Sequence, residues 1–114
     1  MRRTQLGEFE EVVMLAVGIL HEAAYGVSIK KEIESRTGRG VSVGALQSAL
    51  KRLDEKGFLR SREGEATAER AGRPKKYFSI TAEGKKALES AREMRNSMWN
   101  DIPNMAFDLK VTFL

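Results

Sequence analysis

The sequence contains no cysteine and only one histidine. Disulfides and thiolate metal sites are therefore excluded, and no cluster of histidine and acidic residues has the spacing of a metal site. No apolar run approaches the ~20 residues that a membrane span needs. We interpret residues 12–20 as a core helix and not as a signal peptide, because they lack a small-residue cleavage site. We therefore expect a cytoplasmic protein without metal or cofactor.

A catalytic site is also not expected. No nucleophile is marked near His21, and its position at the end of a predicted helix is explained by a favourable interaction with the helix dipole. No other group of residues has the roles that a reaction needs. We therefore predict that the protein is not an enzyme.

The charge balance is basic, with 20 lysines and arginines against 16 acidic residues, a net charge of +4 over 114 residues. Such a balance suits an anionic partner, most simply a nucleic acid. Hydrophobic residues make up 41% of the chain and charged residues 32%, a composition typical of one globular domain. Because so short a chain buries a limited share of its surface, a second subunit would help to stabilise it.

Helical periodicity predicts a first helix over residues 6–21 and a second over residues 25–37. The first is apolar on almost every side, so it must be covered on more than one face, by its own domain and by a partner subunit. Ile29 and Ile33 form the inner stripe of the second helix, which Gly38 and Gly40 end.

A third helix begins at Ser42, a good N-cap residue, and stops at Gly57. Leu46, Leu50 and Leu53 recur at i, i+4 and i+7 and should face the core. The opposite face is small, polar and basic, with these members: Gly44, Gln47, Ser48 and Lys51, with Arg52 to one side. It is either a DNA-reading surface or a solvated helix face.

Two short strands are predicted over residues 58–62 and 76–80, joined by a polar loop too long for a tight turn. Thr81 then caps a fourth helix, which ends near Ile102 because Pro103 disfavours helical geometry there. The predicted fold is mainly α with a two-stranded β-hairpin. It is a winged helix-turn-helix (residues 1–81) followed by a C-terminal dimerisation helix and tail (residues 82–114).

Several motifs together resemble the PadR family of bacterial transcriptional regulators, of the short type with a single C-terminal helix. They are LGEFEE from Leu6, AYGVSI from Ala24, SVGAL from Ser42, LKRLDEKGF from Leu50, GRPKKYF from Gly72 and ITAEG from Ile80. The resemblance covers roughly residues 6–100. It implies a dimeric DNA-binding regulator, often a repressor, that frequently responds to a small molecule. One position departs from the pattern, because Gln47 stands where the family commonly has tyrosine.

The DNA contacts that we predict combine the third helix with the hairpin. Gln47 could pair bidentately with adenine, Gly44 and Ser48 leave room for close approach, and the resemblance implies that the hydroxyl of Tyr25 contacts a phosphate. The alternatives are a core tyrosine with an exposed hydroxyl and an ordinary basic loop. The complete predicted set is Tyr25, Ser42, Gly44, Gln47, Ser48, Lys51, Arg52, Arg70, Arg73, Lys75 and Lys76.

A homodimer interface is predicted from the apolar first helix and from the fourth helix, where the resemblance places it. Its members are Phe9, Val13, Val17, Leu88, Ala91, Met94, Met98, Trp99 and Ile102. Trp99 either anchors this interface by packing or contacts an effector, which the family analogy alone implies.

The leading hypothesis is a dimeric, sequence-specific regulator that binds an inverted repeat in double-stranded DNA, acts as a repressor and is relieved by a small hydrophobic effector. Two alternatives remain open. One is a protein-interaction module that uses the winged-helix fold, and the other is a structural protein that binds DNA of any sequence.

Overall fold

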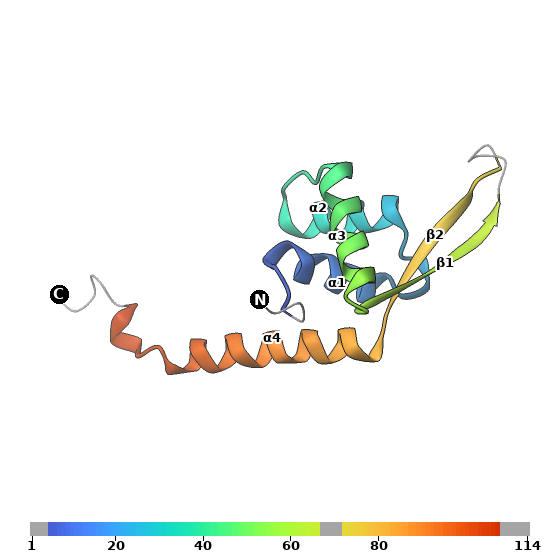
Figure 1. Ribbon diagram of the computed structural model, residues 1–114. Coiled ribbons are helices and arrows are strands. Elements are labelled where there is room, and N and C mark those ends of the chain that lie inside the picture. Colours follow the sequence, from blue (N-terminus) through green and yellow to red (C-terminus); the bar gives the residue numbers. More distant parts are fainter. Residues whose placement is uncertain (1–4, 67–71, 108–114) are drawn as a thin grey trace.

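The computed structural model describes residues 5–66 and 72–107 and shows the predicted winged helix with an added C-terminal helix (Figure 1). In chain order, the elements are α1 (Glu8–Leu20), a 3-10 turn (His21–Ala23), α2 (Gly26–Thr37), α3 (Val43–Glu55), β1 (Leu59–Ala66), β2 (Pro74–Ile80), α4 (Ala82–Asp101) and a second 3-10 turn (Asn104–Ala106). The hairpin projects from one side of the domain formed by α1, α2 and α3, and the end of α4 projects from the other. Within the described ranges, no helix is long and apolar enough to cross a membrane.

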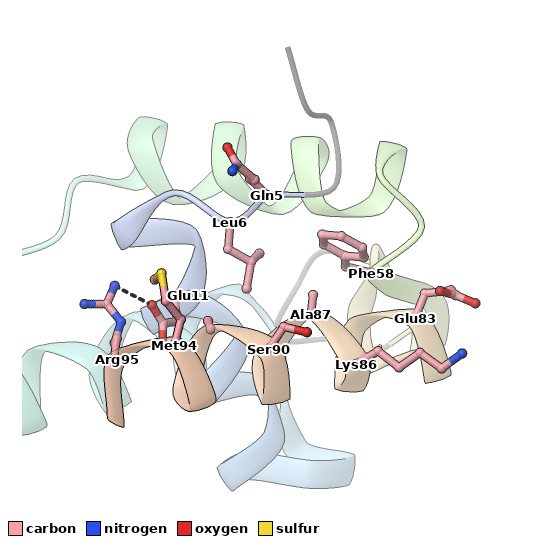
Figure 2. A pocket seen from close by; sticks show the side chains of 11 residues that line it. Gln5, Leu6, Glu11, Phe58, Glu83, Lys86, Ala87, Ser90, Met94 and Arg95 are labelled. Carbon is pink, nitrogen blue, oxygen red and sulfur yellow. Dashed lines mark hydrogen bonds and ion pairs between the residues drawn. The ribbon is translucent and has the colours of Figure 1, made fainter. Parts of the chain in front are cut away.

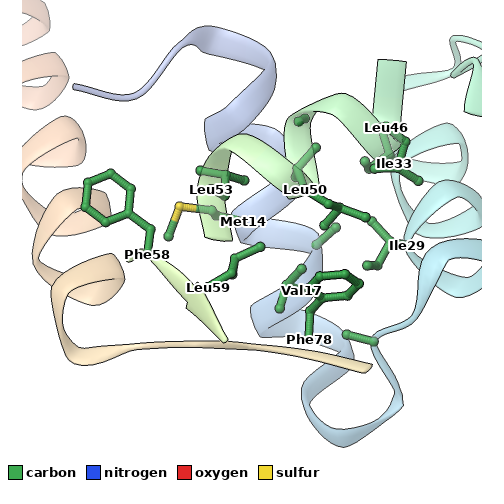
Figure 3. Close-up of a cluster of buried hydrophobic side chains, with 14 of the residues drawn as sticks. Met14, Val17, Ile29, Ile33, Leu46, Leu50, Leu53, Phe58, Leu59 and Phe78 are labelled. Atoms are coloured by element: carbon green, nitrogen blue, oxygen red, sulfur yellow. The ribbon is translucent and has the colours of Figure 1, made fainter. Parts of the chain in front are cut away.

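One apolar core lies between α1, α2, α3 and the base of the hairpin (Figure 3). Leu46, Leu50 and Leu53 of α3 are almost completely buried, as their i, i+4, i+7 spacing predicted. They meet Met14 of α1 and Ile29 of α2 in the same cluster. Burying side chains of this size contributes roughly 1.5–3 kcal/mol each. The core therefore sets how α3 lies, and with it the direction of the outer face of α3.

The side of α1 that faces the core differs from the prediction. Val13 and Val17, predicted for the subunit interface, lie completely inside the core of the single chain. A side chain without exposed surface cannot contact a second subunit, so the prediction is wrong for both. Leu15 and Ile19 are exposed instead. Because α1 is apolar on almost every side, its periodicity alone did not distinguish the two faces.

Side-chain caps define the starts of α3 and α4 where the sequence predicted them. The Ser42 hydroxyl accepts a hydrogen bond from the Ala45 amide at 3.0 Å, and the Thr81 hydroxyl accepts one from the Gly84 amide at 3.0 Å. Each bond satisfies an amide that has no partner within the helix. α4 ends at Asp101, and the backbone of Ile102 is extended before Pro103, as the restriction on residues preceding proline requires.

Both strands of the hairpin are longer than predicted. Leu59 pairs with Ile80 and Arg62 pairs with Tyr77, and the register shifts between Glu63 and Ala66. The sequence did not predict the extension because these residues are polar. Strand pairing depends on backbone N–H and C=O groups, which do not vary with the polarity of the side chain. Phe58, predicted as the first strand residue, lies just before β1 and is buried in the core.

The hairpin is attached to the start of α2. The amide of Phe78 donates a hydrogen bond to the carbonyl oxygen of Ala24 at 2.8 Å, and Tyr25 forms a β-bridge with Tyr77. The Phe78 side chain is also buried in the core. These contacts orient the wing relative to α2 and therefore relative to α3.

A buried carboxylate joins α1 to α3. Glu10 is 4% exposed, and its oxygens accept hydrogen bonds from Arg52 Nε at 3.0 Å, Lys56 Nζ at 2.8 Å and the Gly7 amide at 2.7 Å. Burial raises the pKa of Glu10, but the hydrogen bonds from Lys56, Gly7 and Arg52 outweigh it and hold the pKa below its ordinary value of 4.5. The carboxylate therefore stays charged and stabilises the packing of the two helices.

We predict that Glu10→Gln lowers the free energy of unfolding at pH 7 by about 2 kcal/mol, because two charge-assisted hydrogen bonds are lost. The contribution of Glu10 is present above pH 4.5 and is lost as the pH falls through its lower folded-state pKa. The difference between the two proteins should therefore shrink below pH 4.5. Urea unfolding from pH 3 to pH 7 measures it, and a difference that is independent of pH would contradict the assignment.

We also predict opposite effects for two glycine-to-alanine substitutions. A Cβ on Gly84 would overlap the carbonyl oxygen of Phe58 and lie 2.9 Å from Met14 Cε, so Gly84→Ala should destabilise the protein by roughly 1–3 kcal/mol. A Cβ on Gly44 would meet nothing within 4 Å, so Gly44→Ala should stabilise α3 by up to about 1 kcal/mol. Thermal unfolding of the two variants compares them, and equal midpoints would show that α4 does not pack as described.

Candidate nucleic-acid interface

The outer face of α3 is exposed and uncharged apart from one lysine. Gly44, Gln47, Ser48 and Lys51 are all exposed, on the side of the helix opposite Leu46. The face therefore has the small and polar composition that the sequence predicted. Ser42 is exposed too, but its hydroxyl is already occupied by the N-cap hydrogen bond.

Arg52 is directed to the flank of α3 that meets α1, and not along this outer face. Its Nε donates to Glu10, while its side chain remains about half exposed. Lys56 binds the same carboxylate and also the carbonyl oxygen of Gln5 at 2.8 Å. The sequence did not reveal this arrangement, because Glu10 lies 42 residues before Arg52. Only the terminal guanidinium nitrogens of Arg52 are left for an external anion.

A hollow of about 320 Å³ lies where α2, α3 and β2 meet. Its lining combines polar, basic and apolar residues, with these members: Tyr25, Gly26, Val27, Lys30, Val43, Leu46, Gln47, Lys76 and Phe78. The predicted contacts Tyr25, Gln47 and Lys76 are thus brought together around one depression. Val27 and Val43 also line the hollow and are exposed, and sequence reasoning did not single them out because no charge or polar group marks them.

Tyr25 belongs to a cluster in which two aromatic rings lie between two cationic side chains. Lys75 Nζ lies 4.1 Å from the centroid of the Tyr25 ring, and the Tyr25 and Tyr77 rings meet edge to face at 5.6 Å. Arg62 lies 4.7 Å from the Tyr77 ring on the neighbouring strand. Contacts of this type are worth about 0.5–1 kcal/mol each at exposed sites. The sequence could not pair Arg62 with Tyr77, because that contact depends on the hairpin register.

The remaining wing residues are placed as follows. Lys76 lies on β2 and Arg73 immediately precedes it, and both side chains are exposed. Arg70, the other predicted wing contact, lies outside the described residues. The wing therefore brings cationic side chains close to Tyr25 at the start of α2, next to the hollow that Gln47 lines. Within the described part of the chain, no group of histidine, cysteine or acidic residues could hold a metal ion.

A second, separate surface follows α4. Met98 and Trp99 are each 64% exposed, and Met94 and Ile102 are also exposed, as are Leu15 and Ile19 of α1. Leu88, Ala91 and Phe9 are half-buried. Apart from Val13 and Val17, the residues predicted for the subunit interface thus keep surface available. A row of large apolar side chains on one helix is unusual for a monomer.

A hollow of about 640 Å³ lies between the N-terminal segment and α4 (Figure 2). Leu6, Phe58, Ala87 and Met94 contribute to its lining, and Glu11 binds Arg95 at 2.8 Å at one end. Trp99, the predicted effector contact, is not part of this lining. Its ring instead meets Phe107 at 5.4 Å between centroids.

Comparison with known proteins agrees with this architecture. Residues 15–90 match the transcriptional regulator PadR-like family, whereas no curated protein matches the chain. A PadR family transcription regulator from Clostridium difficile R20291 is 23% identical, with a TM-score of 0.65 over 81% of this chain and 92% of that one. A PadR-like transcription factor from Bacteroides fragilis is 26% identical, with a TM-score of 0.66 over 83% and 89%.

A PadR-like transcriptional regulator from Bacillus cereus is 18% identical, with a TM-score of 0.70 over 89% of this chain and 93% of that one. The same fold is thus found in proteins described as transcriptional regulators. Because the matched residues run from within α1 into α4 and include the whole of α2, α3 and the hairpin, the chain belongs to the transcriptional regulator PadR-like family.

Proposed function

We propose that the protein is a homodimeric repressor that binds a specific site in double-stranded DNA and is released from it by a small hydrophobic effector. The observation that carries the proposal is the exposed polar face of α3 beside a cationic wing. Residues 1–81 would form the DNA-binding domain, and residues 82–114 would form the dimerisation helix and tail.

The physical argument begins with shape. A major groove about 12 Å wide admits one α-helix, and the N-terminal residues of a recognition helix contact base edges there. Gly44 and Ser48 allow the backbone of α3 to approach the DNA. Gln47 and Lys51 supply hydrogen-bonding groups, and neither side chain has a hydrogen-bond partner among the described residues. Lys75 and Lys76 on the wing would then lie along phosphates or enter the minor groove.

Dimerisation is supported by the exposed apolar side chains of α4. Burying a side chain such as Met98 against a partner would contribute about 1.5–3 kcal/mol. In a two-fold dimer, α4 would set the distance between the two α3 helices, which should be ~34 Å for half-sites one turn apart. An effector that changes the angle of α4 would then change DNA affinity, with Trp99 as the proposed contact.

We predict that replacing Lys51 and Lys76 together by Gln weakens binding to a preferred duplex by about tenfold at ~150 mM salt. The slope of log K against log salt should also become less steep by about 1 to 2, because fewer counterions are released. Fluorescence anisotropy with labelled duplexes, including the DNA upstream of the protein's own gene, measures both. Replacing Lys85 and Lys86 of α4 by Gln removes the same charge away from α3 and should leave affinity unchanged.

Gly44→Ala provides a second test of the same face. Its added methyl group meets nothing in the free protein, so weaker binding by this variant reports a close approach of DNA to α3. Unchanged binding by both the lysine variant and Gly44→Ala would favour the protein-interaction module. Equal affinity for every duplex would favour a DNA-binding protein of structural type.

We predict that Met98→Glu converts the protein to a monomer at micromolar concentration, because it places a charge in the proposed interface. Sedimentation equilibrium measures the mass. Val27→Glu introduces the same charge at an exposed apolar residue of α2, outside the proposed interface, and should leave the dimer intact. A monomeric wild-type protein would overturn the dimer proposal.

A further inference from the structure

Val43, the first residue of α3, has an apolar side chain that is largely exposed. It is 61% exposed. It begins a row at i, i+4 and i+8 whose other members are Gln47 and Lys51, both exposed. A β-branched residue is also a slightly poor helix former. Its side chain is therefore available to an external partner along the same row as the proposed DNA contacts.

The surroundings of Val43 distinguish it from an ordinary exposed residue. It lines the hollow between α2, α3 and β2 together with Val27, which is 49% exposed. The Gln47 amide lies in the same place, since a Cβ on Gly26 would come 3.4 Å from Gln47 Nε2. An apolar group and a carboxamide thus lie side by side on the face proposed to enter the major groove, with Lys76 at the edge of the hollow.

In the major groove this combination matches one kind of base pair. A carboxamide can bond to both N6 and N7 of adenine, and the only apolar group that the groove presents is the C5-methyl of thymine. Four residues of α-helix rise about 6 Å, and successive base pairs are ~3.4 Å apart. Contacts made by Val43 and Gln47 would therefore fall within one or two base pairs of each other.

We propose that Val43 and Gln47 are specificity-determining residues that together select A·T pairs, with Val43 packing on a thymine methyl and Gln47 bonding to a nearby adenine. This inference rests on the proposed DNA-binding function and adds to it a sequence preference in each half-site. α2, which carries Val27, is expected to cross the phosphate backbone, as the first helix of a helix-turn-helix does. Val27 therefore lies outside the proposed reading pair.

The test begins with selection of preferred duplexes from a random pool by the full-length protein at ~150 mM salt. Each thymine of the selected half-site is then replaced by deoxyuridine, which removes only the methyl group. Wild-type protein should bind about fourfold more weakly when one particular thymine is replaced, the factor that corresponds to ~0.8 kcal/mol. Val43→Ala should bind the thymine and deoxyuridine duplexes equally.

Gln47 is tested on the same duplex with 7-deazaadenine, which lacks the N7 acceptor. Replacing the contacted adenine should weaken wild-type binding about fivefold or more and leave the affinity of Gln47→Ala unchanged. Val27→Ala is the matched control, because it removes the same atoms from the other wall of the hollow. It should keep the full response to deoxyuridine.

The outcomes separate this inference from the function on which it rests. If the pool yields no preferred duplex, both are overturned. A preferred duplex that shows no response to deoxyuridine at any thymine overturns the role of Val43 alone, as does a Val43→Ala protein that keeps the wild-type response. Thermal unfolding of Val43→Ala should match the wild type, because the replaced side chain is exposed.

Discussion

The hydrogen bonds of Glu10 hold together the parts of the molecule on which its function depends. A buried carboxylate is costly unless it is paired, and this one has three donors: Arg52 of α3, Lys56 at the C-cap of α3 and the Gly7 amide. The neighbouring Glu11 binds Arg95 of α4. Two consecutive acids in the first turn of α1 thus contact both the proposed recognition helix and the proposed dimerisation helix.

This arrangement divides the basic residues into two groups. Arg52 and Lys56 neutralise Glu10 and contribute to folding. Lys51, on the outer face of α3, has an exposed side chain. On the wing, Lys75 is held over the ring of Tyr25. Net charge alone therefore overstates the charge available to a nucleic acid. The useful quantity is the number of cations that remain on the α3 and wing surface after internal pairing.

The two proposed binding surfaces differ in the physical force that they offer. The α3 and wing surface is polar and cationic, so its interactions depend on salt and on hydrogen-bond geometry. The α4 surface is apolar, and its contribution to association grows with the area that it buries. Because α4 follows directly after β2, separated by Thr81 alone, the spacing of two α3 helices in a dimer would follow from the packing of α4.

The sequence by itself determined the order of the elements, their caps and the outer face of α3. Local spacing was enough to predict these features, because each depends on residues within one or two helical turns. The examples are the buried stripe of Leu46, Leu50 and Leu53 and the N-caps Ser42 and Thr81. Only the tertiary structure decided that Val13 and Val17 face the core, that Arg52 binds Glu10 and that Arg62 lies over Tyr77. These contacts depend on how distant segments are packed and on the register of the hairpin, and several arrangements satisfy the same local pattern.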